Sequence, residues 1–171
     1  GYAAASFNLA KLDIAERKYD AARSRYEQML AKDPKNEPAL LALAELLAGT
    51  KAPEAEVRGV LDRAVAANPQ SVRARIMLIG FHGQQGNWPA AMAAARSAHA
   101  SLPESPQILE ALAATQHAAG ETNQAIETYR RAAERMPENA APLLRIAELQ
   151  VLTKDYDGAI EIRAAARDPG S

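Results

Sequence analysis

The sequence has no cysteine among its 171 residues, and only 5% of them are aromatic. A disulfide framework and a cysteine-ligated zinc site are therefore excluded. No excess of charge of one sign is present either, since 20 Lys and Arg stand against 21 Asp and Glu. Proteins that bind nucleic acid usually carry a basic excess or a basic run. The sequence therefore predicts no nucleic-acid partner.

Long hydrophobic runs are also missing. No apolar stretch approaches the roughly 20 residues that a membrane-spanning helix needs. The chain opens in the middle of a helical pattern with Gly1 and Tyr2, and it shows no signal peptide. We interpret it as a fragment of a longer protein whose targeting signals lie elsewhere, which leaves the compartment open.

The motifs of catalysis are absent from the sequence. It contains no Gly-x-Ser-x-Gly elbow, and the run Gly83–Gly86 lacks the Lys and Ser or Thr of a phosphate loop. His82 and His117 are 35 residues apart, but no pattern supplies the third ligand of a metal site. The sequence thus predicts a protein that is not an enzyme and that has no metal and no cofactor.

What the sequence has in plenty is Ala and Leu, which dominate a hydrophobic fraction of 48% and favour an all-α fold. The stretch from Ser105 to Pro137 reads as two amphipathic helices across a Gly, closed by a Pro. Its pattern recurs along the chain, and the closing prolines are spaced by 35, 34 and 34 residues at Pro34, Pro69, Pro103 and Pro137. A period of this size indicates a stack of helical hairpins.

Five hairpin units follow from this period, covering residues 3–36, 37–71, 72–105, 106–139 and 140–167, the last one incomplete. In the first unit we expect helices over about Ala3–Arg17 and Asp20–Lys32. An Asn or Ser stands directly before four of the first helices and is expected to cap them, at Asn36, Ser71, Ser105 and Asn139. The second unit has one extra residue in its turn, and Pro53 is expected in the first turn of the helix that follows.

These residues resemble the tetratricopeptide repeat. With the closing Pro as position 32, a large apolar residue stands at position 7 in Leu9, Leu43, Leu78, Leu112 and Ile146. A small residue stands at position 8 in Ala10, Ala44, Ala113 and Ala147, with Ile79 as the exception. Positions 20 and 27 are mostly Ala, in Ala22, Val57, Ala91, Ala125 and Ala159, and in Met29, Ala64, Ala98, Ala132 and Ala166. The aromatic residue that the family has at position 4 is missing in all five units. The resemblance implies a right-handed α-solenoid of ten antiparallel helices.

The resemblance also implies a function, because the first helices of such an array line a concave groove that binds a peptide or a partner helix. Family geometry places positions 2, 5, 9, 12 and 13 on this face. The residues expected to bind a protein or peptide partner there are Phe7, Lys11, Leu41, Glu45, Arg73, Ile76, Gln84, Glu110, His117, Leu144 and Glu148. We therefore expect a non-catalytic protein–protein interaction scaffold.

A narrower resemblance concerns the setting. Phrases such as PALLALAELLAG are similar to the tetratricopeptide lipoproteins of bacterial exosortase/PEP-CTERM systems. This implies a periplasmic or outer-membrane-anchored role in exopolysaccharide export or protein sorting. Two alternatives stay open, a cytoplasmic adaptor or cochaperone and a polysaccharide-binding module. The clamp of chaperone-binding members is incomplete, since Phe7 and Ala42 replace its Lys and Asn.

The fifth unit ends early. Asp168 and Pro169 come about two residues before the position where the repeat places its closing Pro. Arg163 stands where the first and fourth units have Tyr26 and Tyr129. A repeat buries its apolar stripe only against its neighbours. We therefore expect this last unit to fray first or to dock onto another copy, giving a homodimer through exposed terminal helices.

Overall fold

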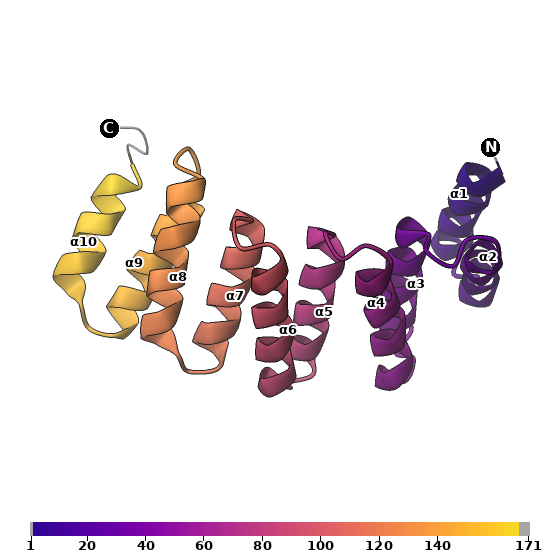
Figure 1. Cartoon of the computed structure of the whole chain (residues 1–171), viewed down its shortest axis with the longest axis horizontal. Helices are drawn as coiled ribbons and strands as arrows, with labels where there is room; N and C mark the ends of the chain where they lie inside the picture. The colour runs from indigo at the N-terminus through magenta and orange to yellow at the C-terminus, as the bar shows by residue number, and fades with distance from the viewer. Residues whose placement is uncertain (1, 168–171) are drawn as a thin grey trace. The chain divides into compact units, whose positions relative to one another are not determined.

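The computed structural model describes residues 2–167, and their side chains from Ala4 onward. These residues form ten α-helices and no strand (Figure 1). The helices are α1 (Tyr2–Ala15), α2 (Tyr19–Lys32), α3 (Glu37–Gly49), α4 (Glu54–Ala67), α5 (Val72–Gln84), α6 (Trp88–Ser101), α7 (Pro106–Ala118), α8 (Thr122–Arg135), α9 (Ala141–Leu152) and α10 (Tyr156–Ala165). The all-α prediction is confirmed. The early Asp168 and Pro169 lie outside the described residues.

The chain divides into two compact units, Gly1–Ala74 and Arg75–Ser171, with the boundary inside α5. In the first unit α1 packs on α2, α2 on α3, and α3 on α4. In the second unit α6 packs on α7, α7 on α8, α8 on α9, and α9 on α10. Each unit is therefore built from consecutive helical hairpins, each of which packs on the next.

The residues at the signature positions of the repeat form the core. At position 8 the exposed fraction of the side chain is 0–6%, in Ala10, Ala44, Ile79, Ala113 and Ala147. At position 20 it is 0–3%, in Ala22, Val57, Ala91, Ala125 and Ala159. A residue without a long side chain lets the two helices of a hairpin approach closely. The hairpin contact therefore depends on these positions.

Contact between successive repeats is clearest where α9 follows the α7–α8 hairpin. Ile126 and Tyr129 of α8 share one apolar cluster with Ile146 and Leu149 of α9. The four side chains are 8%, 7%, 0% and 5% exposed, respectively. Positions 21 and 24 of one repeat thus pack against positions 7 and 10 of the next.

Three of the four predicted helix caps form as expected. The side chains of Asn36, Ser71 and Ser105 accept hydrogen bonds from backbone N–H groups three residues on, at 3.1, 3.0 and 3.4 Å. Asn139 differs, because α9 begins at Ala141 and its side chain accepts from the Ala141 N–H, two residues on, at 3.0 Å. Pro53 is the residue before α4 and not part of its first turn.

Each hairpin turn contains one residue in the left-handed region. These residues are Arg17, Lys51, Gly86, Gly120 and Lys154, with φ of 59°, 58°, 67°, 87° and 64°. Each lies 34 or 35 residues after the one before. The backbone therefore repeats with the period of the sequence, even where the expected Gly is replaced. A residue other than Gly loses about 1–2 kcal/mol of stability in this conformation, because its Cβ atom comes too close to the backbone.

Replacing Lys51 by Gly is expected to stabilise the fold by about 0.5–1 kcal/mol, because Gly adopts a positive φ without strain but loses more entropy on folding. Gly120→Ala is expected to destabilise it by about 1 kcal/mol for the same reason. Urea unfolding followed by circular dichroism measures both changes. A shift of the free energy of unfolding in the same direction for both variants would contradict backbone strain at Lys51.

Overpacking tests the close contact at Ala125, which is fully buried beside Ala113. Ala125→Leu is expected to lower the free energy of unfolding by roughly 1–3 kcal/mol, because the added atoms have no space. The matched control is Ala114→Leu, at an exposed position of α7, which should leave stability nearly unchanged. Equal melting temperatures for the two variants would contradict the assignment of Ala125 to a close-packing position.

Candidate partner-binding site

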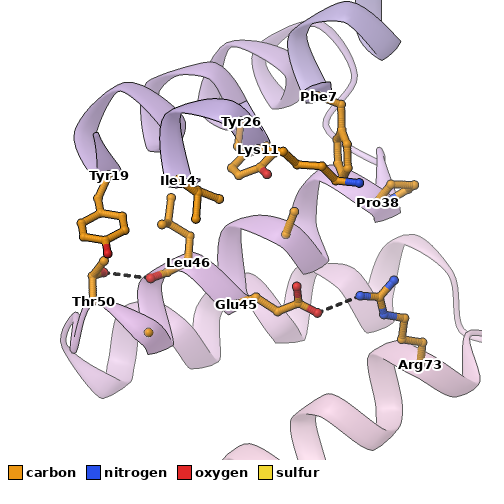
Figure 2. A pocket seen from close by; sticks show the side chains of 12 residues that line it. Phe7, Lys11, Ile14, Tyr19, Tyr26, Pro38, Glu45, Leu46, Thr50 and Arg73 are labelled. Carbon is orange, nitrogen blue, oxygen red and sulfur yellow. Dashed lines mark hydrogen bonds and ion pairs between the residues drawn. The ribbon is translucent and has the colours of Figure 1, made fainter. Parts of the chain in front are cut away.

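The unit of residues 1–74 contains an open cavity of about 510 Å³ between α1, α2 and α3. Figure 2 shows the side chains of α1 and α3 facing each other across it. The cavity is lined by Phe7, Lys11, Ile14, Tyr19, Tyr26, Pro38, Ala42, Glu45, Leu46, Gly49, Thr50 and Arg73. A mostly apolar hollow with a few charged groups suits a peptide or a partner helix.

Helical spacing explains why these residues meet. In α3 the lining residues Pro38, Ala42, Glu45 and Gly49 follow one another at intervals of four, three and four. Residues three and four apart lie on one face of a helix. Because Ala42 and Gly49 are small, this face leaves the hollow open.

The cavity has an aromatic and cationic end. The Phe7 and Tyr26 rings meet edge to face, with centroids 5.6 Å apart and planes at 61°. The Lys11 ammonium lies 5.0 Å from the centre of the Phe7 ring, which gives a cation–π contact. Among the described residues Lys11 has this contact and no carboxylate partner. Its charge is thus available to an acidic group of a ligand.

The opposite wall holds an exposed ion pair. An Nη atom of Arg73 donates to Oε1 of Glu45 at 2.7 Å, and the two side chains are 65% and 54% exposed (Figure 2). Solvent screens such a pair, so a ligand can replace either partner at small cost. Burial raises the pKa of Tyr26, and the nearby Glu45 carboxylate adds to the shift. Tyr26 therefore stays a neutral phenol in the cavity at neutral pH.

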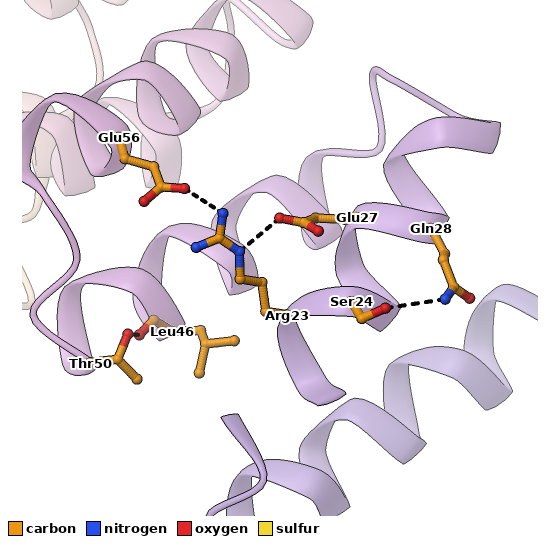
Figure 3. Close-up of polar contacts among 7 residues, drawn as sticks. All are labelled: Arg23, Ser24, Glu27, Gln28, Leu46, Thr50 and Glu56. Atoms are coloured by element: carbon orange, nitrogen blue, oxygen red, sulfur yellow. Dashed lines mark hydrogen bonds and ion pairs between the residues drawn. The ribbon is translucent and has the colours of Figure 1, made fainter. Parts of the chain in front are cut away.

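Polar contacts behind the cavity hold its helices together. Arg23 of α2 donates to Glu27 of the same helix at 2.8 Å and to Glu56 of α4 at 2.5 Å (Figure 3). Arg25 of α2 donates to the buried carboxylate of Asp13 in α1, also at 2.5 Å. These contacts link α2 to α1 and to α4.

Four of the five site residues predicted in this unit line the cavity, namely Phe7, Lys11, Glu45 and Arg73. Leu41 differs, because its side chain is only 3% exposed and belongs to the core. Pro38, at position 2 of the predicted face, does line the cavity, whereas at position 5 the neighbouring residue Ala42 lines it in place of Leu41. Sequence reasoning also missed Tyr26 and Leu46, which it treated as core or left unassigned. The spacing from Pro38 to Gly49 was the available signal.

The unit of residues 75–171 holds the other predicted residues, and they are not gathered in one hollow. Gln84 and His117 are exposed near the ends of α5 and α7, and Ile76 is half-buried. Leu144 and Glu148 line a second hollow of about 410 Å³, together with Ala147, Val151, Leu152 and Arg163. Leu144 is 46% exposed. Its surroundings therefore differ from those of Leu41, the residue at the same repeat position.

A tyrosine and a glutamate recur together in both units. Tyr129 and Glu148 stand at the repeat positions of Tyr26 and Glu45. Burial raises the pKa of Tyr129, while Arg145 opposes the shift and Glu110 and Glu148 add to it. Here Glu110 occupies the position of Phe7, and its pKa is raised by burial. The surroundings of Tyr129 are thus more polar than the aromatic end of the first cavity.

Within residues 2–167, no group of three or more His, Asp and Glu residues could hold a metal ion. No helix in this range is long and apolar enough to span a bilayer.

Comparison with known families accounts for the repeat. Two family models, both described as "Tetratricopeptide repeat", match residues 13–55 and 116–169 and residues 58–107. The chain belongs to the tetratricopeptide repeat family. The general resemblance seen in the sequence is thereby confirmed, whereas the narrower likeness to exosortase/PEP-CTERM lipoproteins has no support from these matches. A search of curated proteins found no match.

Solved tetratricopeptide repeat structures share this fold. A MamA protein aligns with a TM-score of 0.75 and 19% identity, over 98% of this chain and 91% of that chain. PilF from Pseudomonas aeruginosa aligns with a TM-score of 0.74 and 19% identity, over 99% of this chain and 77% of that chain. YrrB, described as a TPR protein with an unusual peptide-binding site, aligns with a TM-score of 0.68 and 15% identity, over 96% of this chain and 84% of that chain. At these identities the likeness shows the fold alone.

The raised pKa of Glu110 predicts a pH-dependent stability. A carboxyl whose folded pKa lies above its unfolded value binds more protons when folded, so stability falls as pH rises from the unfolded pKa through the folded one. Glu110→Gln removes the half-buried charge and should therefore raise the melting temperature at about pH 7, with a smaller gain at about pH 4. Thermal unfolding at both pH values measures the difference. An equal gain in melting temperature at both pH values would show that burial of the carboxylate charge is not the cause.

Proposed function

We propose that the chain is a non-catalytic protein–protein interaction scaffold whose cavity between α1, α2 and α3 binds a peptide or a partner helix. The observation that carries the proposal is the exposed Lys11 ammonium held over the Phe7 ring at the edge of an apolar hollow. An apolar side chain of the ligand enters between Phe7, Ile14 and Leu46. An acidic group close to it in the ligand pairs with Lys11.

Ligand size and charge follow from the lining. A cavity of about 510 Å³ accommodates a short segment and not a whole domain. The Arg73–Glu45 pair at the far wall presents one charge of each sign, so it selects the register of a charged segment more than it adds affinity. We infer that preferred ligands contain a large apolar residue next to Asp or Glu.

The cellular setting is a further part of the proposal. We keep an envelope role in exopolysaccharide export or PEP-CTERM protein sorting as the setting that the sequence phrases favour, and a cytoplasmic adaptor or cochaperone as its alternative. Capture of partners on the immobilised chain, from envelope and from cytosolic extracts of the source organism, distinguishes them. Specific capture of an export component supports the first, and specific capture of a cytosolic protein supports the second.

A polysaccharide is the alternative ligand class, because Phe7, Tyr19 and Tyr26 all line the cavity. A sugar ring needs an open aromatic face. Tyr26 is only 1% exposed and Lys11 lies over Phe7, which leaves Tyr19, 42% exposed, as the accessible ring. One accessible ring makes a weak platform, so the geometry favours the peptide.

Selection from a random peptide library displayed on phage tests the peptide proposal. Enriched peptides are expected to combine an apolar and an acidic residue. Their binding, measured by fluorescence anisotropy, should weaken at least about tenfold with Lys11→Glu, since the variant replaces attraction by repulsion at the cavity edge. Phe7→Ala should weaken it similarly by removing the aromatic wall.

The matched control is Arg58→Glu, which makes the same charge change at an exposed position of α4 outside the cavity lining. It should leave the affinity within about twofold of the parent chain. Peptides that bind all three variants equally would place the binding surface elsewhere. A library that yields no enriched peptide would overturn the peptide proposal.

A further inference from the structure

The turn of the α5–α6 hairpin carries the single tryptophan of the chain (Figure 1). Trp88 is the first residue of α6 and is 38% exposed. Its hairpin is the third of five, so hairpins precede and follow it along the chain. The exposure of Trp88 is therefore not a consequence of where the sequence begins or ends.

The indole ring of Trp88 lies against the backbone of α5 at Gly83. A Cβ atom built on Gly83 would lie 3.4 Å from Cζ3 and 3.9 Å from Cη2 of the indole. A methyl group would therefore just touch the ring, and a longer side chain would displace it. Three other hairpins have longer side chains at this repeat position, in Ile14, His117 and Val151. Gly83 thus leaves room for the ring to be held on the helix while part of it stays open to solvent.

The stretch around this turn contains none of the four charged residue types. From Ile76 to Ala95 the sequence has no Asp, Glu, Lys or Arg, whereas these residues make up 24% of the whole chain. The turns of the other four hairpins each hold at least one of them, for example Arg17, Lys51, Glu121 and Lys154. A charged ligand would find no partner of opposite sign within this stretch, and removing water from its charge would be unfavourable. The turn therefore favours an uncharged ligand.

Three side-chain amides stand in the same turn. Gln84 ends α5, Gln85 follows it, and Asn87 directly precedes α6. Oδ1 of Asn87 accepts a hydrogen bond from the Ala90 N–H at 3.2 Å, which leaves its NH2 group to donate. In the described part of the chain the exposed amides of Gln84 and Gln85 have no hydrogen-bond partner. An amide both donates and accepts, so the turn suits a ligand that is rich in hydroxyl groups.

Backbone hydrogen bonds hold the turn in one conformation. The N–H of Gly86 donates to the carbonyl of Gly83 at 3.0 Å, and the N–H of Asn87 donates to the carbonyl of His82 at 3.0 Å. Gly86 has a φ of 67°, which glycine adopts without strain. The amides and the indole are therefore carried on a preformed backbone, which lowers the entropy lost on binding.

We propose that the α5–α6 turn binds an uncharged saccharide, with a sugar ring stacked on Trp88 and its hydroxyl groups hydrogen-bonded to the three amides of the turn. A pyranose presents C–H groups on one face and hydroxyl groups around its edge. The face of an aromatic ring is electron-rich and attracts such C–H groups. The saccharide site is independent of the proposed peptide function, because none of its residues lines the α1–α3 cavity.

A proline-rich segment is the other kind of ligand that stacks on tryptophan. Such segments bind in grooves that are lined by several aromatic rings. Apart from Trp88 and the imidazoles of His82 and His99, the only aromatic side chain of the hairpin is Phe81. Phe81 is 9% exposed and belongs to the core. One exposed ring beside three amides therefore fits the saccharide better.

Tryptophan fluorescence tests the proposal on the whole chain, because the only indole is the one at the site. The probes are cellohexaose, maltohexaose and N-acetylchitohexaose, three uncharged oligosaccharides that differ in linkage and substituents. At least one is expected to change the Trp88 emission saturably, with a Kd on the order of 1 mM for one stacked ring and a few hydrogen bonds. Because the ligand is uncharged, this Kd should be the same in about 0.05 M and about 0.5 M NaCl.

Variants assign the binding to the turn, and saturation-transfer-difference NMR measures their affinity without a tryptophan signal. Trp88→Ala should weaken binding at least about tenfold, and Gly83→Val, which displaces the ring, at least about threefold. Gln84→Ala combined with Gln85→Ala should weaken it by a similar threefold or more, to about the same Kd. The matched control is Tyr156→Ala, at the repeat position of Trp88 in the last hairpin and 58% exposed. It should leave the Kd within about twofold of the parent chain.

Circular dichroism checks that each variant keeps its helices. Peptides selected for the α1–α3 cavity should bind Trp88→Ala as tightly as the parent chain. The saccharide proposal and the peptide proposal can therefore fail separately.

Three results would overturn the proposal. One is an unchanged Trp88 emission with all three oligosaccharides up to about 20 mM, beyond the expected range of Kd. Another is binding that persists undiminished in Trp88→Ala, since the contact would then lie elsewhere. The third is a proline decamer that binds at Trp88 when no saccharide does, which would assign the ring to a proline-rich segment.

Discussion

A single helical hairpin cannot bury its own apolar stripe, and the rest of the structure depends on this constraint. Alanine at the hairpin contacts, such as Ala10 against α2 and Ala113 against α8, lets the two helices pack closely and leaves the larger side chains to point toward the next repeat. Tyr129 and Ile146 meet there, 7% and 0% exposed. Stability therefore resides in contacts between neighbours, as expected for repeat proteins.

The same constraint produces the candidate binding site. The first helices use two faces for packing, and a third face, marked in α3 by Ala42 and Glu45, is left open. Small residues keep this face hollow, and Phe7 and Lys11 give it an aromatic ring and a positive charge. At equivalent repeat positions the second unit has Glu110 in place of Phe7 and Arg145 in place of Ala42. One backbone plan thus presents a surface of different polarity in each unit.

The constraint also explains why one repeat position differs in exposure along the chain. Position 21 is buried where a described hairpin follows it and exposed where none does, as a comparison of Ile126 at 8% with Ile160 at 67% shows. Arg163 stands at the position where the first and fourth units have Tyr26 and Tyr129.

The sequence by itself determined the period, the hairpins, the small residues at the close contacts and most helix caps, because each of these is a local property repeated in phase. It also predicted Phe7, Lys11, Glu45 and Arg73 on one face of the first helices. Only the tertiary structure decided that Leu41 is buried while Leu144, at the same repeat position, is 46% exposed. It alone also decided that Leu9 faces outward while Leu43 is in the core. The reason is physical: the exposure of a repeat position depends on whether a neighbouring hairpin covers it, and a residue's own sequence phase does not record that neighbour.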